Sequence, residues 1–144
     1  LFVNITRVFK LPSPDENDRN TGYKGAIKCD RPLPAGKRWY RFQGGAGTQM
    51  PTKCVPRYYC GTHAPGWLSD AHPTVGEGAV QRKVCFHWTS GCCQWSSNIN
   101  VRNCGGFFVY ELVEPPGCSM RYCGETFQGS RDQTLFFILP SFQI

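Results

Sequence analysis

The stretch CFHWTSGCCQW, residues 85–95, decides how the chain is built, because it gathers three cysteines, a histidine and two tryptophans. Three roles compete for these cysteines: metal ligands, a catalytic thiol, or disulfides. Nine cysteines in 144 residues is far above average usage and approaches the density of secreted disulfide-rich domains. The composition therefore favours disulfides and an extracellular location, either secreted or at the cell surface.

Spacing argues against the first two roles. The cysteines lie at positions 29, 54, 60, 85, 92, 93, 104, 118 and 123, without the Cys-x-x-Cys pair that most structural zinc sites use. His63, His72 and His87 do not add a regular ligand spacing. No cysteine stands beside a base that would activate it as a nucleophile. We therefore predict neither a metal nor a cofactor.

Cys92 and Cys93 are adjacent, and this limits how they can bond. Neighbouring Cα atoms lie about 3.8 Å apart, less than the usual span of a disulfide, so a bond between these two would be strained. In an extended segment their side chains point to opposite faces. We expect each to bond to a different partner on a different side of one strand.

Length and composition indicate one small domain that is mainly β, with long loops and little helix. The chain has 16 Gly, 11 Pro and 20 aromatic residues, which favour short strands joined by turns. The net charge of +6 is spread out, and the tightest basic cluster is only Lys37, Arg38 and Arg41, so we predict no nucleic-acid partner. No apolar run approaches the roughly 18 residues of a membrane span.

Residues 98–104 and 107–112 predict a hairpin around Gly105 and Gly106. Val101 then pairs with Tyr110 on an apolar face, and Arg102 pairs with Val109 on a mostly polar one. A second strand is predicted over residues 79–88 and a third over 38–43. Segments 44–52 and 61–78 are expected to be loops.

Longer motifs add a family resemblance. The chain contains WYRFQ, QMPTKC, GWLSDAHP, GCCQW and PPGCSMRYC in that order. Over residues 15–124 it resembles the eight-cysteine extracellular domain shared by uromodulin, the pancreatic secretory granule glycoprotein and the liver zona-pellucida-like protein. The resemblance implies a non-enzymatic module beside EGF-like or zona-pellucida modules. It also implies four disulfides: Cys29–Cys118, Cys54–Cys92, Cys60–Cys123 and Cys85–Cys93.

Two features depart from this family. Cys104 has no partner, because the cysteine expected about twenty residues before Cys29 is missing. It is a free thiol, an intermolecular bond, or the sign of a non-native N-terminus, and we favour the last. Residues 1–14 are then a linker or foreign segment, and 125–144 an uncertain tail. Glu111 stands where uromodulin carries a glycan, and the one glycosylation motif begins at Asn4.

Two classes of function follow. The first is a recognition or adhesion module that binds a protein or a glycan through its loops. A lectin-like variant would use Trp67, with His72 as a further contact. The second is a hydrolase using Asp70, His72 and Glu77 in the 70–77 loop. Because turn residues beside prolines and glycines usually make local hydrogen bonds, we predict that the chain is not an enzyme.

Overall fold

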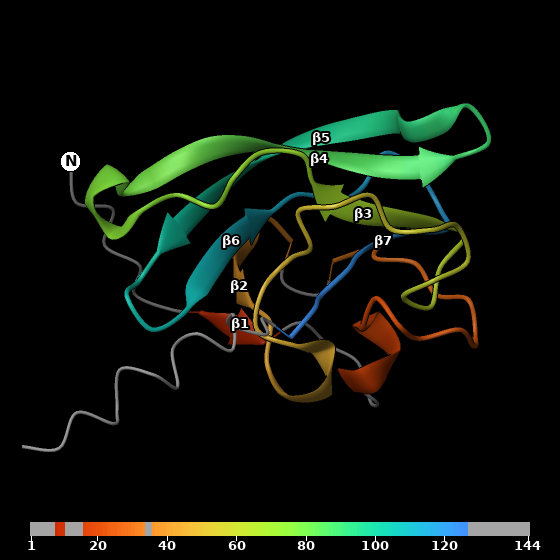
Figure 1. Ribbon diagram of the computed structural model, residues 1–144, viewed down its shortest axis with the longest axis horizontal. Coiled ribbons are helices and arrows are strands. Elements are labelled where there is room, and N and C mark those ends of the chain that lie inside the picture. Colours follow the sequence, from red (N-terminus) through yellow and green to blue (C-terminus); the bar gives the residue numbers. More distant parts are fainter. Residues whose placement is uncertain (1–7, 11–15, 34–35, 127–144) are drawn as a thin grey trace, which may run out of the picture.

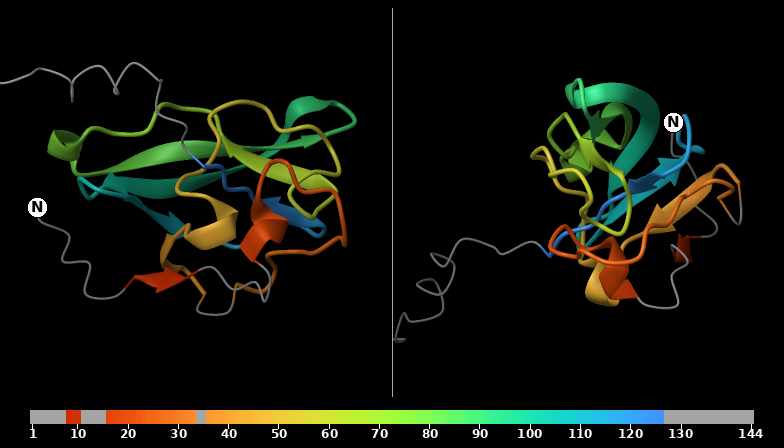
Figure 2. Two further views of the ribbon diagram at one scale, coloured as in Figure 1. Left: turned by 60° about the horizontal axis from the view of Figure 1, so that its bottom comes forward. Right: turned by 90° about the vertical axis from the view of Figure 1, so that its right-hand side faces the viewer.

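The structure, a computed structural model, describes residues 8–10, 16–33 and 36–126. Within these residues, seven strands form one curled sheet in the order β1-β2-β6-β5-β4-β3-β7 (Figures 1 and 2). The strands are β1 Phe9–Lys10, β2 Arg38–Arg41, β3 Ala64–Leu68, β4 Ala79–Trp88, β5 Gly91–Asn103, β6 Phe108–Leu112 and β7 Met120–Tyr122. The predicted mainly β class is therefore confirmed.

The helical content of the described residues is three short 3-10 turns. These are η1 Glu16–Arg19, η2 Gly44–Ala46 and η3 Val75–Glu77. None of the helices in this part of the chain has the length and hydropathy of a bilayer span. The first two turns contact each other on the same side of the sheet (Figure 1).

The long strands β4 and β5 form the central hairpin, and β5 continues into a second hairpin with β6. Val101 pairs with Tyr110 and Arg102 with Val109, so the predicted register is confirmed. The Cys104 amide donates to the Phe107 carbonyl at 2.8 Å and closes the turn. Gly105 adopts φ 95°, a conformation that residues with a side chain rarely adopt.

The core lies on one face of this sheet. Its largest apolar members, each almost fully buried, are Tyr40, Phe42, Met50, Leu68, Val84, Phe86, Ile99, Val101, Tyr110, Leu112 and Tyr122. Those in the strands come mostly from alternate positions, as the period of two requires. A smaller cluster, Val55 with Cys60 and Cys123, lies under the loops and packs against Tyr59 and Trp67.

The prediction that residues 61–78 form one loop is wrong. Residues 64–68 form β3, which pairs antiparallel with β4 and parallel with β7. The sequence does not predict this strand, because it contains Pro65 and Gly66, and proline and glycine are rare in strands. Gly66 is required by packing: a Cβ there would lie 2.7 Å from Cε1 of Phe86 and 2.9 Å from the Arg121 carbonyl oxygen.

The described structure continues on both sides of the segment 15–124. The short strand β1 pairs parallel with β2, so Phe9–Lys10 belong to the sheet. At the other end Glu125 bridges Gln49, with its amide donating to the Gln49 carbonyl at 2.8 Å. The boundaries at 14 and 124 stay predictions, and the glycosylation motif at Asn4 lies outside the described residues.

Candidate recognition surface

Four disulfides brace the sheet and its loops. They join Cys29 to Cys118, Cys54 to Cys92, Cys60 to Cys123 and Cys85 to Cys93. These are the same pairs that the family resemblance implies. The adjacent Cys92 and Cys93 therefore reach different partners, one in a loop and one on the neighbouring strand. Cys104 is exposed and has no disulfide partner within the described part of the chain.

Two of these bonds hold the loop of residues 54–63, one at its start and one toward its end. Within this loop Tyr58 has φ 69° and Cys60 has φ 51°. A bulky residue at positive φ is an outlier that costs on the order of 1 kcal/mol and persists only where surrounding structure enforces it. Here the Tyr58 amide donates to the His63 carbonyl at 3.1 Å. The loop is therefore a rigid support for its side chains.

Side chains of this loop and of the end of β4 form a cluster, which we call the aromatic patch: Arg57 and Tyr58, which are exposed, and His63 and Trp88, which are half-buried. Tyr58 is 51% exposed. Its ring centroid lies 5.7 Å from that of His63 and 5.6 Å from that of Trp88, both edge-to-face. The Arg57 guanidinium lies 5.8 Å from the Trp88 ring centroid, within cation–π range.

Residue types of this kind dominate the binding energy of protein interfaces. Tyrosine, tryptophan and arginine are enriched at such hot spots because they offer a large area with a polar end, and the two aromatic residues have few rotatable bonds. No pattern in the sequence indicates the patch, because residues 58, 63 and 88 are brought together only by the disulfides and by the pairing of β3 with β4.

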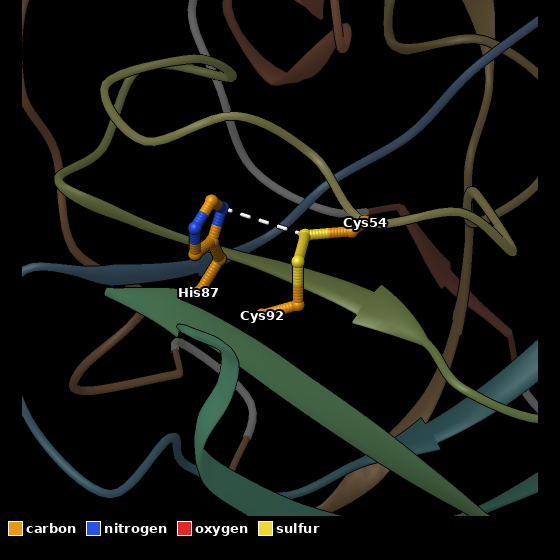
Figure 3. Close-up of side chains that lie close together, drawn as sticks. All are labelled: Cys54, His87 and Cys92. Atoms are coloured by element: carbon orange, nitrogen blue, oxygen red, sulfur yellow. Dashed lines mark hydrogen bonds between the residues drawn. A yellow bond between two sulfur atoms is a disulfide. The ribbon is translucent and has the colours of Figure 1, made fainter. Parts of the chain in front are cut away.

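His87 lies beside the Cys54–Cys92 bond. Its Nδ1 is 3.4 Å from Sγ of Cys54 (Figure 3). The same Nδ1 is 2.8 Å from the Val55 carbonyl oxygen. The His87 nitrogen and the two sulfurs all lie within 4.8 Å of one another, a separation that suits a metal. Because the sulfurs are bonded to each other, neither carries the thiolate that binds zinc. His87 and the Cys54–Cys92 disulfide hold the start of the 54–63 loop against β4 and β5.

Trp67 is only half-buried, yet it is held from two sides. Its indole Nε1 donates to the Cys92 carbonyl at 2.8 Å, and its ring packs against the cluster of Val55, Cys60 and Cys123. The structure therefore gives Trp67 a structural contact beneath the loop that carries the aromatic patch. The sugar-stacking role of Trp67 stays a prediction.

His72 lies elsewhere, over the β6 strand. Its Nε2 is 2.8 Å from the Tyr110 hydroxyl, and its ring centroid is 4.3 Å from that of Phe108. The hydroxyl accepts the Met50 amide at 3.0 Å, so its own proton is directed at His72. Burial, with a contribution from the charge of Arg82, lowers the pKa of His72 to about 4. A neutral His72 thus fixes the loop to the sheet.

Asp70 and Glu77, the other two candidate catalytic residues of the 70–77 loop, each bond to a different residue. Asp70 accepts the Lys83 amide at 3.0 Å. Glu77 accepts the Thr74 amide at 2.6 Å and the Thr74 hydroxyl at 3.1 Å, and these bonds lower the pKa of Glu77. Asp70 and Glu77 make these bonds to residues other than His72. Their contacts are the local hydrogen bonds expected of turns and caps.

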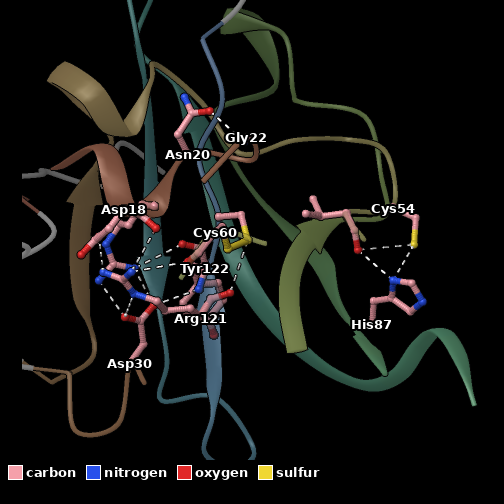
Figure 4. The surroundings of a disulfide bond; sticks show 12 residues. Asp18, Asn20, Gly22, Asp30, Cys54, Cys60, His87, Arg121 and Tyr122 are labelled. Atoms are coloured by element: carbon pink, nitrogen blue, oxygen red, sulfur yellow. Dashed lines mark hydrogen bonds and ion pairs between the residues drawn. A yellow bond between two sulfur atoms is a disulfide. The ribbon is translucent and has the colours of Figure 1, made fainter. Parts of the chain in front are cut away.

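A buried ionic cluster lies beside the Cys60–Cys123 bond (Figure 4). The sequence patterns do not indicate this cluster. Its members are Asp18, Arg19, Asp30 and Arg121, each at most 4% exposed. Arg19 binds both carboxylate oxygens of Asp30 at 2.7 Å, and Arg121 binds Asp18 at 2.9 Å. Such residues are almost never fully buried unless paired. The cluster joins η1, the segment before Pro32 and β7.

Comparison with known proteins gives consistent matches. Residues 40–124 match the family model of the uromodulin-like domain. The chain is 46% identical over 106 residues to uromodulin from Rattus norvegicus, covering 73% of this chain and 16% of the relative. It is 45% identical over 114 residues to the pancreatic secretory granule membrane major glycoprotein GP2 from Canis lupus familiaris, covering 78% of this chain and 21% of the relative.

Proposed function

The chain belongs to the uromodulin-like domain family, and from that premise we propose that it is a non-enzymatic recognition module of an extracellular glycoprotein. The observation that carries this proposal is the aromatic patch on a loop held by two disulfides. Such a scaffold presents its side chains with little loss of conformational entropy on binding. The four disulfides fit an extracellular or secretory location.

The non-enzymatic part of the proposal rests on the 70–77 loop. Asp70, His72 and Glu77 are each engaged by a different partner, and His72 is fixed between Tyr110 and Phe108. A general base must reach its substrate and titrate near the working pH. His72, with a pKa lowered to about 4 and its Nε2 occupied, meets neither condition.

The partners are a further part of the proposal. The chain spans about a fifth or less of the length of the relatives it matches. We propose that EGF-like or zona-pellucida modules stand beside it in the parent protein, and that its ligand is a protein or a glycan. The aromatic patch favours a protein ligand, because Tyr58, Trp88 and Arg57 have the composition of an interface hot spot.

Arrays of immobilised extracellular proteins and of glycans, probed with the oxidised chain, test this function. The informative variant is Tyr58→Gly, because glycine keeps φ 69° while removing the ring. We expect a bound ligand whose affinity falls by about tenfold or more in this variant. Val75→Ala is the matched control, since Val75 is a 60% exposed apolar residue outside the patch.

Two outcomes would contradict the proposal. One is an oxidised chain that binds nothing on either array. The other is a ligand bound equally well by the parent chain and by Tyr58→Gly. Non-reducing peptide mapping of each protein should show that the four disulfides are intact. Loss of binding in a variant then cannot be attributed to misfolding.

A further inference from the structure

A cleft of about 610 Å³ opens beside β2, where the segment 41–49 faces the turn between β5 and β6. Its volume lies within the range of small-ligand sites. Its lining includes the side chains of Arg41, Gln43, Gln49, Phe107 and Phe108. The turn between β5 and β6 and the turn between β4 and β5 lie toward opposite ends of the molecule (Figure 1). This cleft is therefore distinct from the aromatic patch.

Arg41 gives the cleft its chemical character. Its Cζ lies 3.9 Å from the centroid of the Phe107 ring, which holds the guanidinium in place. Its Nε is buried and has no hydrogen-bond partner among the described residues. A buried donor without a partner costs about 1–3 kcal/mol, so proteins seldom keep one without a reason. Because this Nε is itself closed to solvent, a ligand oxygen in the cleft would meet the other N–H donors of the Arg41 guanidinium.

The positive charge of the cleft determines which class of ligand oxygen binds there. Among the described residues, the lining contains the Arg41 cation and no carboxylate side chain. A guanidinium binds carboxylate through two parallel hydrogen bonds, which are about twice as strong as neutral ones. An anionic group with paired oxygens, such as a carboxylate, therefore suits Arg41.

The remaining lining indicates what carries that carboxylate. Gln43 and Gln49 bring amide groups, which both donate and accept hydrogen bonds and so suit hydroxyl groups. Phe107 and Phe108 are half-buried and line the same cleft. Hydroxyls, an apolar ring face and a carboxylate occur together in an acidic sugar. We propose that this cleft binds the acidic sugar residue of a glycan, at a second site that goes beyond the recognition function proposed for the aromatic patch.

Titration calorimetry on the full oxidised chain tests this site with four probes. The methyl glycosides of N-acetylneuraminic acid and glucuronic acid are the acidic sugars, methyl glucoside is the neutral sugar, and acetate is the bare carboxylate. We expect an acidic sugar to bind about tenfold or more tightly than either control. Binding should weaken as salt is raised, because a partly exposed charge pair is screened.

Variants locate the site. Arg41→Gln should lower the affinity for the acidic sugar by about tenfold or more, and Arg41→Lys should restore only part of it, because a lysine cannot form the paired bonds. Arg38→Gln is the matched control: it removes one positive charge from the same strand at an exposed position. Gln43→Ala provides a second test, since Gln43 is exposed and its loss should leave the fold intact while weakening binding of the acidic sugar.

Equal affinity for methyl glucoside and the acidic sugars, or no binding of any probe, would overturn the proposal. So would acetate binding as tightly as the acidic sugars, or an equal loss in Arg41→Gln and Arg38→Gln. Tyr58→Gly separates this site from the wider function. This variant should leave binding of the acidic sugar unchanged. A chain that binds no acidic sugar would thus contradict only the proposal for the cleft, and a ligand unaffected by Tyr58→Gly would contradict only the proposal for the aromatic patch.

Discussion

Arg121 lies against Asp18 inside the protein, with Nη2 of the arginine 2.9 Å from Oδ1 of the carboxylate and both side chains at most 2% exposed. Neither charge can be released to water without unfolding. The same carboxylate also pairs with the partly exposed Lys28. The pair ties η1 to β7 and so places the C-terminal strand beside β3.

The first prediction concerns this pair. Asp18→Asn leaves Arg121 buried with one fewer anion, and breaking a buried pair in this way destabilises a protein by about 3–5 kcal/mol. Urea unfolding followed by fluorescence measures the loss. Glu114→Gln is the control, because Glu114 is 44% exposed and lies 3.6 Å from Arg31, so its removal should change stability by less than about 1 kcal/mol. Equal losses would refute the structural role of the pair.

The hairpins could be predicted from the sequence, but this cluster could not. Val101 and Tyr110 were paired correctly because alternation of apolar residues and the turn at Gly105 fix the register locally. Asp18 and Arg121 lie near opposite ends of the domain, and charged residues are normally placed on the surface. β7 was missed because a strand of three residues in a parallel pair leaves almost no periodic signal.

The candidate site was predictable to a lesser extent. The sequence predicts a contact role for Trp67, a tryptophan in a glycine-rich and proline-rich segment, and in the structure its indole donates a hydrogen bond to the Cys92 carbonyl. The exposed ring is that of Tyr58, whose importance depends on a positive φ that no sequence pattern marks. The cleft was equally hidden, because Arg41 and Phe107 meet only after β2 pairs with β6.

Gly66 provides a second prediction. A Cβ at this position would meet the Phe86 ring and the Arg121 carbonyl at distances below normal contact, and both residues are buried. Overpacking of this kind destabilises by about 1–3 kcal/mol. Thermal unfolding of Gly66→Ala should show that loss. Gly76→Ala, where a Cβ would have no neighbour within 4 Å, should be within about 0.5 kcal/mol of the parent chain.

The disulfides differ in the length of chain they close, and this gives a third prediction. Cys29 and Cys118 are 89 positions apart, whereas Cys85 and Cys93 are 8 apart. Because a longer closed loop restricts the unfolded chain more, the stabilisation is about 4–5 kcal/mol for the first bond and about 2–3 kcal/mol for the second. The paired alanine variants should differ in this order by denaturant unfolding. The reverse order would contradict the entropic account.

His72 gives the chain a dependence on pH. The unfolded residue takes up a proton near pH 6.5, and the folded one near 4, because burial and the nearby Arg82 lower its pKa. Between these values the unfolded state binds more protons, so stability is full above pH 6.5 and falls as pH approaches 4. Because His72 is partly exposed, the loss is on the order of 2 kcal/mol after solvent screening.

Unfolding measured at pH 7, 5.5 and 4 tests this dependence. His72→Gln should lower stability at pH 7 and flatten the pH dependence, because the titrating group is gone. A slope that survives in His72→Gln would assign the effect to other groups.

Cys104 supports the last prediction, because it is exposed while the remaining eight cysteines are consumed in four disulfides. Iodoacetamide applied to the folded protein should modify one residue, Cys104, since a disulfide sulfur does not react as a thiolate. The modification should change the free energy of unfolding by less than about 0.5 kcal/mol, as expected for an exposed side chain. Peptide mapping that found Cys104 bonded to a second chain, or a label on any other cysteine, would refute the free thiol.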